Sequence, residues 1–170
     1  AGILFSLGIL LTGKSWALDF PGSFPVGVLR FVANPFSAFF LLIISFLSLA
    51  ASIFAIGYTR EYQGKKNIAL LGFFYNYFIL AMLFVVTVQN AFYFLFFWEI
   101  MSLASYFLVI FDHERPEARS AGTLYLIMTH MGTAFITAAF LLLYVHAGSF
   151  SFDAFRRSEE HTSELQSHHP

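Results

Sequence analysis

The stretch that decides the fold is Ala91 to Phe111, AFYFLFFWEIMSLASYFLVIF, in which Glu99 is the only charged residue. Crossing the hydrocarbon core of a bilayer takes about 20 mostly apolar residues in a helix, and only helices and closed barrels satisfy their backbone hydrogen bonds there. The stretch is therefore predicted to be a transmembrane helix with one carboxyl group near its middle. An ionisable group at that depth costs free energy, so Glu99 is by default a candidate functional residue.

The composition of the whole chain predicts an integral membrane protein. Of its 170 residues, 58% are hydrophobic and only 11% are charged, and the mean hydropathy is +0.72. Glu99 is the only acidic residue inside an expected span. The chain has no cysteine, so it can neither form disulfides nor hold an iron–sulfur cluster through thiolates, and no cofactor is expected in it. A net charge of −1 gives no indication of nucleic-acid binding.

Breaks in the apolar pattern predict an all-α, polytopic transmembrane helix bundle. Residues 1 to 11 lack the features of a signal peptide and are expected to be the end of a truncated helix. Four complete spans are expected, over Phe36–Gly57, Ile68–Val88, Ala91–Phe111 and Ala121–Val145. Asn34 and Pro35 supply a helix start, because Asn caps free N–H groups and Pro is tolerated at the first helical position. Only Gln89 and Asn90 separate the second and third spans, so these should form a tight antiparallel hairpin.

The connecting segments carry two further signals. Trp16, Leu18 and Phe20 alternate with smaller or polar residues, which predicts a short interfacial strand or hairpin. The connectors over residues 58–67 and 112–119 hold five basic residues, against three in the longer connectors on the opposite side. The excess of basic residues in short loops marks the cytoplasmic side, so residues 112–119 are expected inside.

The chain divides into a membrane fragment, residues 1–156, and a tail, residues 157–170. The tail begins RSEEHTSELQSH, is polar and has no apolar face. This string resembles the translation of a common short-read sequencing adapter, so the tail is expected to be artefactual and is excluded from fold reasoning. The alternative is a disordered polar tail of the protein itself.

Glu99 has polar neighbours on its own helix. Ser102 and Tyr106 lie three and seven residues further on and can extend a polar line from the carboxyl group. Burial disfavours the ionised carboxyl and a nearby cation or water favours it, so its proton affinity can be tuned near neutrality. These properties suit a group that loads and releases a proton. The structural alternative is a protonated Glu99 that hydrogen-bonds to a neighbouring helix.

The last span offers a second candidate, His130, near its middle. Thr123, Thr133 and Thr137 share one helical face with His130. Histidine can shuttle protons near neutral pH, and threonine hydroxyls can hold waters. As alternatives, His130 would bond to a backbone carbonyl of an adjacent helix, and the threonines would bond to their own backbone. The sequence shows no phosphate-binding glycine loop, no nucleophile with a base and no metal cluster, so a self-contained enzyme is not expected.

Residues 94–144 resemble the proton-translocating, antiporter-like membrane subunits of respiratory complex I and its relatives. The segment from Trp98 to Tyr106, WEIMSLASY, is the specific part, and Asn34 to Phe40, NPFSAFF, resembles the opening of the family's third helix. The family usually has aspartate where Asn34 stands, a departure at a helix cap. Within the family, the sequence is most similar to the energy-converting hydrogenase branch, which includes hydrogenase 4 and formate hydrogenlyase.

The resemblance implies a membrane subunit of a proton-pumping redox complex in a prokaryotic-type inner membrane, related to NADH-quinone oxidoreductase. Glu99 would be the family glutamate that pairs with a lysine two helices later, beyond the end of this sequence. Other membrane subunits and a peripheral redox arm would be the partners, and the redox cofactors would lie in those subunits. Two alternatives remain: a subunit of a multisubunit cation/proton antiporter, and a membrane scaffold with a structural buried acid.

Overall fold

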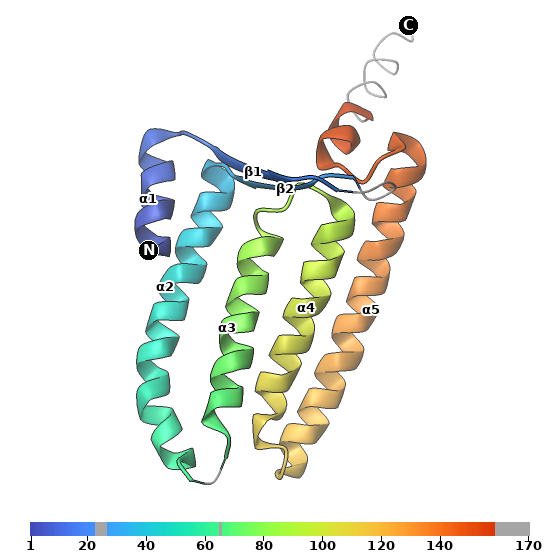
Figure 1. Cartoon of the computed structure of the whole chain (residues 1–170). Coiled ribbons are helices and arrows are strands. Elements are labelled where there is room, and N and C mark those ends of the chain that lie inside the picture. Colours follow the sequence, from blue (N-terminus) through green and yellow to red (C-terminus); the bar gives the residue numbers. More distant parts are fainter. Residues whose placement is uncertain (23–26, 65, 159–170) are drawn as a thin grey trace, which may run out of the picture.

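The computed structural model describes residues 1–22, 27–64 and 66–158, and every structural statement below concerns these residues. Four long helices lie side by side, α2 (Pro35–Tyr58), α3 (Ile68–Val85), α4 (Ala91–Val109) and α5 (Pro116–Ala147), and a short helix α1 (Gly2–Thr12) lies beside α2 (Figure 1). These four helices, taken with their adjoining short turns, are long and apolar enough to cross a membrane. The predicted polytopic helical bundle with four complete spans is confirmed.

Asparagine side chains cap the N-termini of three of the spanning helices. Oδ1 of Asn34 accepts a hydrogen bond from the backbone N–H of Ser37 at 2.8 Å, and Asn67 caps α3 in the same way. Asn90 accepts from the backbone N–H of Phe92 at 2.9 Å at the start of α4. Each cap satisfies a backbone N–H that has no partner within the helix. The predicted helix start at Asn34 is therefore confirmed.

Two helix boundaries differ from the predicted spans by three residues or more. Helix α3 ends at Val85 rather than at Val88, because residues 86 and 87 form a turn and Val88 then pairs with the strand β2 (Leu29–Ala33). The N–H of Val32 donates to the carbonyl of Thr87 at 2.7 Å. At the other end of the bundle, α5 begins at Pro116, five residues before the expected span at Ala121, because proline fits the first helical turn and a polar turn precedes the span.

The predicted interfacial hairpin is also present. The strand β1 (Trp16–Phe20) pairs antiparallel with β2, and Trp16 lies opposite Ala33. Isolated bridges join Phe31 to Val88 and Asn90 to Ser151, so hydrogen bonds run from the hairpin through the α3–α4 connector to the segment after α5. The hairpin therefore crosses one end of the helix row, as Figure 1 shows.

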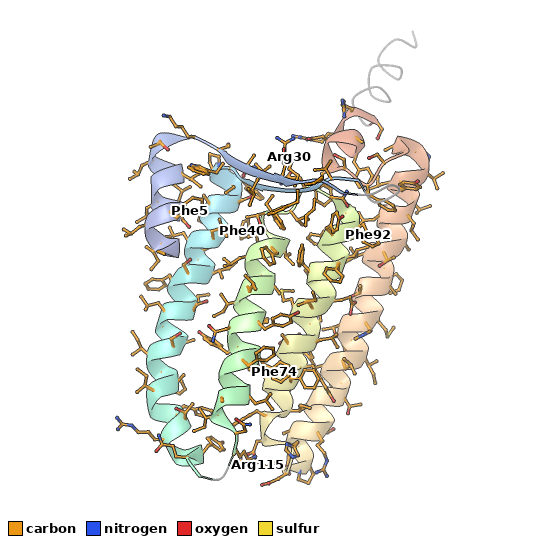
Figure 2. All side chains as sticks on the ribbon, viewed as in Figure 1. Phe5, Arg30, Phe40, Phe74, Phe92 and Arg115 are labelled. Carbon is orange, nitrogen blue, oxygen red and sulfur yellow. The ribbon has the colours of Figure 1, made fainter. Side chains whose placement is uncertain are left out.

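Aromatic side chains fill the contact between α3 and α4. Phe74 stacks on Phe107 with 4.5 Å between ring centroids, and Phe84 lies 4.7 Å from Phe97. Figure 2 shows Phe74 among these side chains, in the lower half of the row. The two helices form the tight antiparallel pair that the short connector predicts.

The opposite end of the bundle is joined by ion pairs. The ammonium group of Lys66, before α3, binds the carboxylate of Asp112 in the short 3-10 turn η2 (Ile110–Asp112) that follows α4. Nε of Arg115 lies 2.9 Å from the other oxygen of Asp112. The α2–α3 and α4–α5 connectors are thus held together.

After α5, residues 152–158 form a short helix that the sequence analysis did not predict. It includes Arg157 and Ser158, the first two residues of the expected tail. Residues 159–170 lie outside the described part of the chain, so the artefactual origin of the tail stays a prediction.

Candidate functional site

Glu99 on α4 and His130 on α5 meet across the contact between the two helices. Nε2 of His130 lies 3.5 Å from Oε2 of Glu99. The sequence singled out both residues separately, and the structure brings them together. Each lies near the middle of its helix, so an acid and a potential base face one another within the membrane-spanning part of the chain.

Contacts on both sides of this pair fix how α4 and α5 lie against each other. Towards the α4–α5 connector, Gly122 lets α5 approach Ile110 closely. A Cβ atom at Gly122 would lie 2.2 Å from Cγ2 of Ile110. Towards the hairpin, the ring centroids of Phe94 and Phe140 lie 5.7 Å apart. The helices are therefore closely packed at both levels, and Glu99 and His130 meet between them.

The second ring nitrogen of His130 bonds to the backbone of its own helix. Nδ1 lies 2.9 Å from the carbonyl oxygen of Leu126 in the preceding turn. A carbonyl oxygen accepts and cannot donate, so we assign Nδ1 as protonated. Nε2 is then the ring nitrogen that faces the Glu99 carboxyl and can accept or release a proton there.

Ser102 and Tyr106 follow Glu99 along the side of α4 that faces α5. Ser102 is buried, with 3% of its surface exposed. Tyr106 is half-buried, and its ring edge would lie 3.4 Å from a Cβ atom at Gly122. Both residues share the side of α4 that carries Glu99. The predicted line of polar side chains therefore runs from Glu99 towards the end of the bundle that holds the α4–α5 connector.

Two of the three threonines on the His130 face of α5, Thr123 and Thr133, bond to their own helix, as the alternative interpretation of the sequence predicts. The hydroxyl of Thr133 donates to the carbonyl of Thr129 at 3.0 Å, and Thr123 donates to the carbonyl of Arg119. Thr133 is nevertheless buried, three residues from His130, with 8% of its surface exposed. Its hydroxyl oxygen keeps acceptor capacity for a water or another donor. His130 likewise bonds to a carbonyl of its own helix rather than to an adjacent one.

The Glu99–His130 pair lies at an open side of the helix row. Within the described chain, 33% of the Glu99 side chain and 49% of the His130 side chain are exposed. Ionisable side chains within a membrane normally face protein or a water-filled cavity rather than lipid tails. The open side of this pair is therefore the side from which water or a further polar group can reach it.

Two features were missed from the sequence. Trp98 stacks on Phe94, and its indole Nε1 is buried without a hydrogen-bond partner in the described residues. The Lys66–Asp112 ion pair could not be foreseen, because the two residues lie in connectors whose distance apart depends on the tertiary fold. Within the same described residues, no group of three or more His, Cys, Asp or Glu side chains could hold a metal ion.

Comparisons with known proteins agree with this architecture. Residues 88–168 match the transmembrane family described as NADH:quinone oxidoreductase/Mrp antiporter. Hydrogenase-4 component B of Escherichia coli strain K12 is 37% identical over 155 residues, which cover 91% of this chain and 23% of that protein. Chloroplastic NAD(P)H-quinone oxidoreductase subunit 5 of Draba nemorosa is 30% identical over 139 residues, which cover 81% of this chain and 18% of that protein.

A solved structure shares the fold. It is the membrane-bound sulfane sulfur reductase, an archaeal respiratory membrane complex, one chain of which aligns with a TM-score of 0.71 and 19% identity. The alignment covers 88% of this chain and 31% of that chain. The present chain spans about a fifth of the length of the two curated relatives.

The fold and these matches define a multi-pass membrane protein of the antiporter-like respiratory type. The family resemblance inferred from the sequence is confirmed. Residues 88–168 carry the match to the NADH:quinone oxidoreductase/Mrp antiporter family, and the chain is similar to hydrogenase-4 component B.

Proposed function

We propose that this chain is part of the proton-translocating membrane subunit of a redox complex, and that Glu99 and His130 form part of its proton half-channel. The 3.5 Å contact between the two side chains carries this proposal. An acid and an imidazole that share one proton can pass that proton between them, and their charge state changes together.

The transfer step needs only the two side chains. The O–H of Glu99 breaks as an N–H forms at Nε2 of His130, which gives a carboxylate and an imidazolium; the reverse step restores the neutral pair. Ser102 and Tyr106 supply hydroxyl groups on the connector side of Glu99, and Thr133 supplies an acceptor beside His130. Waters between these hydroxyls would complete the path.

Electron transfer would take place elsewhere in the complex. We propose that other membrane subunits and a peripheral redox arm are the partners, as in the respiratory complexes named for the relatives. This chain would contribute no redox cofactor of its own. Its part would be to move protons in response to the partners' redox chemistry.

A second candidate is a subunit of a multisubunit cation/proton antiporter, which the Mrp antiporters in the family description favour. The Glu99–His130 pair would serve either function. A sodium gradient that drives proton movement without an electron donor would favour the antiporter, and movement that requires electron transfer would favour the redox complex.

Proton translocation by the full-length subunit, assembled in its complex in membrane vesicles, tests the proposal. Glu99→Gln keeps the size of the side chain but cannot release a proton, so translocation should be lost while the complex still assembles. Glu117→Gln is the matched control, because Glu117 is exposed in the first turn of α5. Normal translocation by Glu99→Gln would reject the half-channel and leave a structural acid.

A further inference from the structure

A pocket of about 280 Å³ lies between α3 and α4, at the end of the bundle that holds the α2–α3 and α4–α5 connectors. Its apolar part is lined by Leu70 and Phe74, in the first two turns of α3, and by Phe107, in the last turn of α4. Figure 2 shows Phe74 above Arg115, which marks the connector end. The pocket therefore lies where the polar connectors meet the apolar spans, which is the depth at which lipid headgroups give way to acyl chains.

Lys66 lies at the polar rim of this α3–α4 pocket, with its ammonium group largely buried. Its side chain is 12% exposed, and Nζ lies 5.7 Å from the centre of the Phe111 ring. Among the described residues the ammonium group donates one hydrogen bond, to Asp112, although it carries three N–H donors. A charge withdrawn from water needs acceptors for its other donors. The rim therefore favours an anionic oxygen beside Lys66.

The start of α3 adds to this attraction for an anionic group. Asn67 caps the helix and lines the same pocket. The positive end of the helix dipole lies at this point, and such ends stabilise phosphate groups. A phosphate at the rim would therefore meet both the Lys66 ammonium group and the N-terminus of α3.

A carboxylate lies next to the ammonium group. Oε2 of Glu114 lies 4.0 Å from Nζ of Lys66, beyond hydrogen-bond distance, and the Glu114 side chain is 77% exposed. Glu114 also lines the pocket. The rim thus presents a cationic donor and an anionic acceptor side by side, above an apolar floor. A neighbour without charges would match only the floor.

We infer that the α3–α4 pocket binds one phosphatidylethanolamine molecule. An acyl chain lies against Phe74 and Phe107, the phosphate accepts a hydrogen bond from Lys66, and the primary ammonium group donates to Glu114. Phosphatidylcholine carries the same phosphate, but its quaternary ammonium group has no N–H to donate. Phosphatidylglycerol has no cation for Glu114. The inference does not depend on proton transfer at Glu99.

Photoactivatable lipids test both the occupant and its headgroup. Ethanolamine, choline and glycerol probes with the same diazirine-bearing acyl chain are added, one at a time and at equal mole fraction, to phosphatidylcholine vesicles that hold the full-length protein in its complex. Mass spectrometry identifies the labelled peptides. The ethanolamine probe should label peptides from residues 66–74 and 107–114 roughly threefold or more above the other two, because only its headgroup makes both hydrogen bonds. Equal labelling, stronger labelling by another probe or no labelling of these peptides would overturn the inference.

Glu114→Gln tests the recognition of the headgroup. The variant should lose the preference for ethanolamine over choline, while labelling by the choline probe stays close to that of the unsubstituted protein, because the phosphate contact with Lys66 remains. Glu117→Gln is the matched control, since Glu117 is exposed in the first turn of α5, outside the lining of the pocket. A preference that persists in Glu114→Gln, or is lost equally in Glu117→Gln, would contradict the inference.

Leu70→Trp tests the position of the acyl chain. The larger side chain fills the apolar part of the pocket, so labelling of residues 66–74 and 107–114 by the ethanolamine probe should fall roughly threefold or more, as for a site that loses most of its room. Leu80→Trp is the control, because Leu80 lies further along α3, outside the lining. Native electrophoresis measures the amount of assembled complex. Unchanged labelling in the assembled Leu70→Trp variant would contradict the inference.

Discussion

Nε2 of His130 lies 3.5 Å from Oε2 of Glu99, while Nδ1 of the same ring lies 2.9 Å from the carbonyl oxygen of Leu126. The second contact fixes the orientation of the ring and assigns a proton to Nδ1. The first contact places Nε2, the ring nitrogen that can accept or release a proton, beside the Glu99 carboxyl. This relationship joins two residues, 31 positions apart in the chain, in one candidate proton-transfer step.

His130→Gln should slow proton translocation in the assembled complex by roughly tenfold or more, because a positioned acid–base group contributes at least that much to a proton transfer. His146→Gln is the matched control, since Nδ1 of His146 also lies 2.9 Å from the carbonyl of the residue four positions earlier, at the end of α5. The initial rate of vesicle acidification is measured for both. Equal rates for the two variants would remove His130 from the pathway.

Gly122→Ala should destabilise the contact between α4 and α5. The new Cβ atom would lie 2.2 Å from Cγ2 of Ile110, and overpacking of this kind costs about 1–3 kcal/mol. Thermal unfolding in detergent measures the loss. Gly132→Ala is the control, because nothing lies within 4 Å of a Cβ atom there. Ile110→Ala should restore stability in the Gly122→Ala background, and a lack of rescue would contradict the assigned clash.

Asn34→Ala should destabilise the start of α2 by about 1 kcal/mol, because the hydrogen bond from the N–H of Ser37 is lost. Asn34→Asp should be close to neutral, because aspartate accepts the same bond and is the residue that the family usually has there. The midpoint of thermal unfolding distinguishes the two variants. Equal losses for alanine and aspartate would show that the cap does not depend on the side-chain oxygen.

Asp112→Asn should loosen the connector end of the bundle, because the carboxylate binds both Lys66 and Arg115. The Lys66 side chain is only 12% exposed, so it would keep a largely buried charge with a weaker partner. A measurable loss of stability is expected, because Lys66 and Arg115 both lose a charged partner.

Proteolysis of the connectors and thermal unfolding measure this loss. Asp153→Asn is the control, since Asp153 pairs with Arg156 on an exposed helical turn, where ion pairs contribute little. Similar effects of the two substitutions would show that the Lys66–Asp112 pair is not a structural link.

Much of the fold could be predicted from the sequence, because membrane spans are set by length and apolar composition. Asn34 marks a helix start by a local hydrogen bond, and the alternation in Trp16–Phe20 marks a strand. The end of α3 was placed too late because Val86 to Val88 are as apolar as a helix interior. Their pairing with β2 is a tertiary effect that hydropathy does not carry.

The site was predictable only in part. Glu99 is evident as the one charge within an apolar stretch, and His130 as a polar residue near the middle of a span. Their contact depends on the rotation of α4 and α5 about their axes, which Gly122 and the Phe94–Phe140 pair set. Ser102, Tyr106 and Thr133 were correctly assigned to shared helical faces, but their part in proton transfer stays a prediction.

The proposed transfer of one proton between Glu99 and His130 is tested most directly by infrared difference spectra recorded as the pH changes. The full-length protein is studied in its complex, with Glu99→Gln and His130→Gln as variants. We expect the carboxyl C=O band of Glu99 and the imidazole bands of His130 to change together, with one proton exchanged. Each variant should then alter the bands of the other residue. Bands that titrate independently, or a carboxyl band that remains in Glu99→Gln, would contradict the proposed transfer.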